Sequence, residues 1–96
     1  MKPSEALMQH RDAIRVIVES NRGANPRVFG SVAHGTDTED SDLDIVIERL
    51  PGLSLFDLAK IHLEIEDLLG ISVDVVTLGS IPERVVDDVL VGSLSL

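Results

Sequence analysis

Two aspartates, Asp42 and Asp44, stand at the head of the apolar run 45–47. Residues two apart in a β-strand point to the same face, so the two carboxylates are expected side by side while Leu43 points into a core. Adjacent carboxylates repel each other, and burying either without a partner is costly. Magnesium resolves this conflict, because Mg²⁺ prefers oxygen ligands, binds through one or two carboxylates and fills its shell with water and substrate phosphates. The pair therefore predicts a metal site that handles phosphate groups.

A glycine–serine pair, Gly30-Ser31, precedes Asp42 with ten residues between them. A glycine lets the backbone approach a phosphate closely. A serine hydroxyl and the N–H groups that open a helix or turn can hold anionic oxygens. One end of this segment therefore suits phosphate, and the other suits metal.

Other phosphate and metal motifs do not fit the segment. Gly30 and Gly35 have the spacing of a P-loop, but Thr36 stands where that loop requires lysine. An EF-hand starting near the aspartates would need glycine and glutamate where Ile45 and Pro51 stand. The chain has no cysteine for a zinc site.

A third carboxylate, Asp74, interrupts the apolar strand predicted over residues 71–77. Aspartate has poor β-propensity, so its presence there suggests that the polar face of the strand meets something charged. Two plainer interpretations stay open. Asp74 could protect an edge strand from aggregation, and Asp42 and Asp44 could be acids exposed to water at the end of a loop.

Alternating patterns along the chain predict an α/β (α+β) fold, with helices packed against a small sheet. Ser4 is expected to cap the first helix and Gly23 to stop it; Ser54 and Gly70 have the same roles in the second long helix. The loop acids Asp37, Glu39 and Asp40 are expected to be solvated. The tail 91–96 is predicted as a small strand or a partner-binding segment. The remaining predictions are helices over 4–22, 31–34, 54–69 and 82–90, and strands over 26–29, 42–49 and 71–77.

Length and composition narrow the class of protein. A chain of 96 residues predicts one domain over residues 1–96. The formal net charge of −9 argues against gripping a long nucleic acid, but fits a small nucleotide delivered with magnesium, or a partner with a basic surface. The chain lacks cysteines, a signal-peptide apolar region and any apolar run long enough for a bilayer, so a cytoplasmic protein without a membrane role is expected.

The combined pattern, Gly30-Ser31 and then Asp42-x-Asp44, resembles the signature of the nucleotidyltransferase superfamily with the DNA polymerase beta-like fold. The short length and the run from Ser41 to Asp44 are similar to the minimal nucleotidyltransferases (MNT), which are paired with HEPN toxins in bacteria and archaea. The resemblance implies a mixed sheet and three carboxylates (Asp42, Asp44 and Asp74) that hold two magnesium ions. It also implies that Gly30, Ser31 and Ser41 bind the nucleotide.

The same resemblance implies an activity and a partner. The enzyme would transfer AMP from ATP to a tyrosine hydroxyl of a cognate HEPN toxin, in a hetero-oligomer, and so act as an antitoxin. Val32 and His34 stand in the segment where many relatives carry basic residues, which would weaken nucleotide binding unless a partner supplies a cation. Two other functions stay open: an antitoxin that neutralises its partner by binding alone, and a transferase acting on a small molecule such as an aminoglycoside.

Overall fold

The protein, seen in a computed structural model that describes residues 1–96, is built on a four-stranded mixed sheet with the order β3-β2-β1-β4. β2 pairs in parallel with β3, whereas β1 pairs antiparallel with both β2 and β4. This arrangement confirms the predicted α/β fold and the mixed sheet. The elements in chain order are α1 (Pro3–Ser20), β1 (Gly23–Phe29), α2 (Gly30–His34), β2 (Leu43–Arg49), α3 (Leu55–Leu69), β3 (Val73–Thr77), the 3-10 helix η1 (Leu78–Ser80), α4 (Glu83–Val91) and β4 (Leu94–Ser95).

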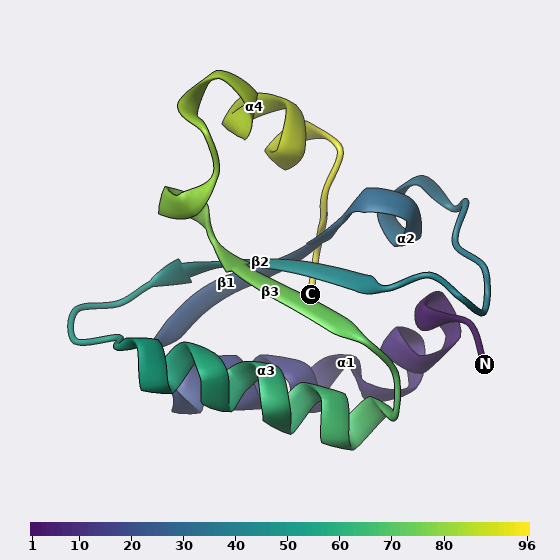
Figure 1. Ribbon diagram of the computed structural model, residues 1–96, viewed down its shortest axis with the longest axis horizontal. Coiled ribbons are helices and arrows are strands. Elements are labelled where there is room, and N and C mark those ends of the chain that lie inside the picture. Colours follow the sequence, from purple (N-terminus) through teal and green to yellow (C-terminus); the bar gives the residue numbers. More distant parts are fainter.

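The two long helices, α1 and α3, cover one face of the sheet, and α4 stands over the other face (Figure 1). The core lies under α1 and α3 because β2 alternates, with Leu43, Ile45 and Ile47 pointing toward the helices. Each such side chain contributes about 1.5–3 kcal/mol when it is fully buried. The opposite face of β2 is thereby left for Asp44 and its neighbours. The fully buried helix side chains in the same core cluster are Ile14, Val18, Ile61 and Ile65.

The ends of α3 form as their local sequence predicts. The Ser54 hydroxyl accepts the Asp57 N–H at 3.2 Å, and the Asp57 carboxylate accepts the Ser54 N–H at 2.9 Å. Gly70 ends the helix in the left-handed conformation with φ of +68°. The predicted caps of α3 are therefore confirmed.

The ends of α1 differ from the prediction. The helix begins at Pro3 after Lys2, so Ser4 is not its cap; proline suits the first helical position because its φ is preset and it needs no N–H partner there. The helix ends at Ser20, and Gly23 already belongs to β1. A Cβ at Gly23 would lie 2.6 Å from Val18 Cγ1, so this glycine permits close strand–helix packing rather than stopping the helix.

The C-terminal tail forms the edge strand β4. Its residues Leu94 and Ser95 pair with β1, and the Leu96 N–H donates to the Pro26 carbonyl at 3.0 Å. Of the two predicted roles for the tail, the small strand is confirmed. None of the helices is both long enough and apolar enough to cross a membrane.

Candidate active site

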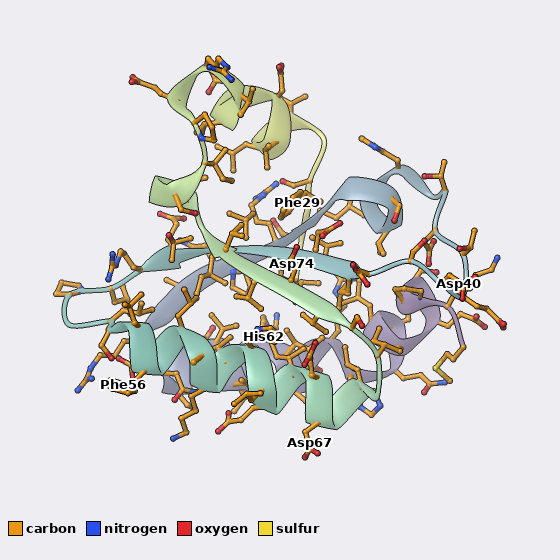
Figure 2. The ribbon with its side chains drawn as sticks, in the orientation of Figure 1. Phe29, Asp40, Phe56, His62, Asp67 and Asp74 are labelled. Carbon is orange, nitrogen blue, oxygen red and sulfur yellow. The ribbon has the colours of Figure 1, made fainter.

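Strand pairing places Asp44 between two residues of the other central strands. In the register of the sheet, Asp44 is opposite Phe29 of β1 on one side and Asp74 of β3 on the other. Asp44 is half-buried and Asp74 is exposed. Figure 2 shows Phe29 and Asp74 on the side of the sheet that faces α4, away from His62 of α3. Two of the three predicted carboxylates thus meet on the open face.

Asp42 lies just outside this ladder. β2 begins at Leu43, whose N–H donates to the Ser72 carbonyl at 3.0 Å, so the strand predicted from Asp42 starts one residue later. The side chain of Asp42 is exposed. Its charge still reaches Asp44, because it contributes to the electrostatics of that carboxyl.

Asp44 is the acid of the three whose pKa is shifted by the other two. Burial raises the pKa of the Asp44 carboxyl above its ordinary value, and the negative charges of Asp74 and Asp42 raise it further. An ionised Asp44 is therefore stabilised by any cation that approaches this face. The site has the charge pattern of a cation-binding position.

The donor set at the site fits magnesium. No three acidic or histidine side chains lie close enough together to hold a metal ion as they stand. Mg²⁺ does not require three, because it is commonly held by one or two carboxylates with substrate phosphates and water completing the shell. Asp44 and Asp74, opposite each other in neighbouring strands, offer such a pair of oxygen ligands.

Gly30 joins the two halves of the motif. It follows Phe29 at the end of β1, adopts a left-handed φ of +72° and opens the short helix α2. A Cβ at this position would overlap the Oδ2 atom of Asp44. Gly30 is therefore required both for its backbone conformation and for the space that Asp44 occupies.

The other predicted nucleotide-binding residues lie in α2 and the loop after it. Ser31 is half-buried in α2, and its carbonyl accepts the Thr36 N–H at 2.9 Å. The Ser41 hydroxyl accepts the Thr38 N–H at 2.9 Å, which closes the turn before Asp42. Ser41 thus has a loop-shaping contact in addition to its predicted role.

Asp37 is not the solvated loop charge that the sequence predicts. It is only 9% exposed, and its carboxylate accepts the Ser4 N–H at 2.9 Å. This backbone hydrogen bond lowers the pKa of Asp37 below its ordinary value. The contact ties the loop between α2 and β2 to the start of α1. No local pattern signals it, because the two residues are 33 positions apart.

The site borders a hollow of about 220 Å³ between α2 and α4. Phe29, Gly30 and His34 line it from one side, and Val85 and Val89 of α4 line it from the other. The role of Phe29 beside the acids was not predicted; its position directly before Gly30 at the end of a strand is the only sequence signal for it. His34 lies on the hollow with an exposed side chain.

Comparisons with known proteins agree with this geometry. The nucleotidyltransferase domain family matches residues 7–94. A protein of Methanocaldococcus jannaschii named "Putative protein adenylyltransferase MJ0435" is 43% identical over 63 residues, which are 66% of this chain and 68% of that protein. The chain therefore belongs to the nucleotidyltransferase domain family, and it is an enzyme of the nucleotide-transferring class, as the Gly-Ser and Asp-x-Asp pattern predicts.

Solved structures confirm the narrower resemblance. One described as "putative minimal nucleotidyltransferase" has a TM-score of 0.90 at 36% identity, covering 97% of this chain and 95% of the other. A chain from the complex of a tri-AMPylated Shewanella oneidensis HEPN toxin with its MNT antitoxin has a TM-score of 0.69 at 18% identity, covering 92% of this chain and 69% of the other. The second likeness shows a shared fold.

Proposed function

We propose that this chain is a magnesium-dependent protein adenylyltransferase, which transfers AMP from ATP to a tyrosine hydroxyl of a cognate HEPN-type toxin and thereby acts as its antitoxin. The observation that carries the proposal is the contact of Gly30 with Asp44, which in turn is paired with Asp74. This contact joins a phosphate-binding position to two carboxylates. A nucleotide whose phosphates lie at Gly30 would therefore present its phosphorus atoms to the acids.

The relatives support the choice of donor and acceptor. The name of the Methanocaldococcus relative describes a protein adenylyltransferase. The Shewanella complex, which shares this fold, contains a toxin that carries AMP groups and is bound to its antitoxin. The hetero-oligomer with a toxin is proposed here on the same grounds.

The proposed roles follow from position. Asp42, Asp44 and Asp74 hold magnesium, which when bound stabilises the negative charge that develops on the phosphates. Gly30 and Ser31 hold the β- and γ-phosphates through backbone N–H groups and the serine hydroxyl. A nucleotide held in this way would have its α-phosphorus near the carboxylates. Positioning and electrostatics supply most of the rate enhancement in such a site.

The transfer itself is an in-line displacement. The acceptor hydroxyl oxygen forms a bond to the α-phosphorus, the bond from that phosphorus to the bridging oxygen breaks, and pyrophosphate leaves. Asp74, exposed on the open face, accepts the hydroxyl proton. The products are pyrophosphate and an acceptor that carries AMP on its oxygen.

The test uses the chain co-expressed and co-purified with the product of the neighbouring gene, as the candidate HEPN-type partner. The pair is incubated with Mg²⁺ and ATP labelled at the α-phosphate, and both proteins are weighed by intact mass spectrometry. We expect one or more AMP masses on the partner and none with the Asp42→Ala/Asp44→Ala variant. A tight complex that gains no mass would favour neutralisation by binding alone. Rapid transfer to an aminoglycoside without a protein partner would favour a small-molecule transferase.

A further inference from the structure

Helix α4 has an apolar face that this chain buries only in part. Val85, Val86, Val89 and Leu90 are half-buried, and Val91 is 88% exposed, so the helix contributes no fully buried residue. Short helices gain most of their stability from packing an apolar face against something. Figure 1 shows α4 standing over the sheet face opposite α1 and α3, which is the face that carries the acids. The apolar face is therefore incompletely covered next to the candidate site.

The hollow between α2 and α4 extends from this helix to Gly30, which adjoins Asp44. Val85 and Val89 form one wall, and Gly30, the residue that contacts Asp44, lies on the other. Its volume of about 220 Å³ is below the ~300–1,000 Å³ typical of pockets for small molecules. The hollow is suited to one inserted side chain rather than to a whole nucleotide.

The charges around α4 indicate which surface fits it. Glu83, Asp87 and Asp88 are exposed on the helix, and Arg84 is its only basic residue. The whole chain carries a formal charge of −9. A second copy would bring the same acidic helix against this one, which like-charge repulsion disfavours, whereas a basic partner is attracted and oriented.

We propose that α4 and the hollow between α2 and α4 form the docking surface for the acceptor protein, an inference that rests on the proposed adenylyltransferase function. A basic amphipathic segment of the acceptor packs its apolar side against Val85 and Val89. One of its side chains enters the α4 side of the hollow, against Val85 and Val89, which leaves Gly30 to the phosphates. Docking there brings an acceptor hydroxyl to the face where Asp44 and Asp74 meet.

The test compares Val89→Glu with a matched control, Leu63→Glu, which places the same charge on an exposed leucine of α3 across the sheet. Val89 is partly buried whereas Leu63 is exposed, so both variants are first checked for a cooperative thermal transition and for binding of a fluorescent ATP analogue with Mg²⁺. Val89→Ser, which adds no charge near Gly30, repeats the test if the glutamate weakens ATP binding. For Val89→Glu we expect the Kd and the KM for the acceptor protein to rise about 30-fold or more, the cost of losing a hot-spot contact. For Leu63→Glu we expect less than about a twofold change.

A second variant tests the charge argument without altering the apolar face. Glu83→Lys/Asp87→Lys, at two exposed acids of α4 outside the hollow, should slow association with the acceptor, and the slowing should shrink as salt is added, because steering by exposed charges is screened. Unchanged acceptor Kd and KM in Val89→Glu would overturn the docking proposal. So would loss of self-association in Val89→Glu with acceptor binding intact, since the helix would then serve a second copy. A wild-type chain that binds the acceptor at α4 but transfers no AMP would overturn the proposed function and leave the docking surface standing.

Discussion

Gly30 has to be glycine for two separate reasons, its backbone conformation and its contact with Asp44. The backbone there has a φ of +72°, and a Cβ would overlap the Asp44 carboxylate. An L-residue in the left-handed region costs about 1–2 kcal/mol, whereas displacement of Asp44 would disturb the acids themselves. The first effect concerns stability and the second concerns chemistry, so they can be separated by mutation.

Gly30→Ala is expected to lower both stability and activity. The strain of about 1–2 kcal/mol should lower the thermal midpoint by several degrees, at roughly 4–8 °C per kcal/mol for a domain of this size. AMP transfer should fall by about 100-fold or more, because carboxylate and phosphate positions shift together. Gly70→Ala is the matched control: its φ of +68° is equally left-handed, but nothing lies within 4 Å of the added Cβ. Equal losses of activity in the two variants would contradict the special role of Gly30.

Asp44→Asn should make the metal-free protein more stable at neutral pH. Burial and two neighbouring acids raise the pKa of Asp44 in the folded chain. A raised carboxyl pKa means that the ionised form costs stability; the cost is absent below the unfolded pKa and fully present above the folded one. Urea unfolding at neutral pH should therefore show a higher midpoint for the variant, and the difference should vanish as the pH falls through this range.

The same variant should lose function while it gains stability. Mg²⁺ with ATP should raise the thermal midpoint of the wild type but not of Asp44→Asn, and transfer should fall by about 100-fold or more. Asp67→Asn, an exposed acid on α3, should alter neither property. A lower unfolding midpoint for Asp44→Asn without metal would show that Asp44 has a stabilising partner. Repulsion from the neighbouring acids would then not be the dominant effect on its carboxylate.

At the scale of elements, the loop between α2 and β2 is held by a long-range contact. Asp37 caps the start of α1 through the Ser4 N–H, and a carboxylate at a helix N-terminus is also favoured by the helix dipole. Asp42 follows this loop directly. The anchoring of the loop therefore limits how far Asp42 can move from Asp44.

Asp37→Ala should cost about 0.5–2 kcal/mol at neutral pH, the usual range for loss of an N-terminal cap. Because the pKa of Asp37 is lowered in the folded state, its stabilisation is present above the unfolded pKa and disappears as the pH falls through the folded one. Urea unfolding of wild type and variant should therefore converge in acid. Asp40→Ala removes an exposed acid of the same loop and should be neutral. A variant pair that behaves alike at neutral pH would show that the Asp37 contact is not stabilising.

How far each element could be predicted depends on whether its signals are local. The caps of α3, Ser54 and Gly70, act within a few residues of their own helix, and they form as predicted. The start of α1 and the burial of Asp37 depend on partners far along the chain, so periodicity and turn signals do not reveal them. The bulge near Asn25, with φ of +48°, likewise lets β1 begin three residues before the predicted strand.

In the candidate site too, features with local sequence signals could be predicted and those that depend on distant contacts could not. Gly30 and Asp44 are separated by one short helix and one loop, and their spacing alone predicts that phosphate and metal positions are neighbours. Phe29 was missed because an aromatic residue at a strand end is ordinary until its pairing with Asp44 is known. The position of α4 over the acids could not be predicted, since an amphipathic helix does not indicate which surface will cover it.

At the scale of the whole molecule, the candidate site combines residues that are close in the sequence with one that is far from them. Gly30 lies on α2 and Asp44 on β2, which are consecutive elements. Asp74 arrives only after α3, through the parallel pairing of β3 with β2. Parallel pairing across a long connection is slow, because the entropy of closing the connection must be overcome before the contacts form.

The late arrival of β3 has a kinetic consequence. Asp74 carries a negative charge toward Asp44 when the edge strand β3 docks, so the proposed arrangement of acids opposes that docking step. Asp74→Asn should therefore refold about twofold faster in stopped-flow measurements without Mg²⁺, if β3 pairs in the transition state. Asp67→Asn should refold at the wild-type rate. An equal rate for Asp74→Asn with slower unfolding would place the docking of β3 after the barrier, so that the enzyme would acquire its third acid only once the rest of the chain had folded.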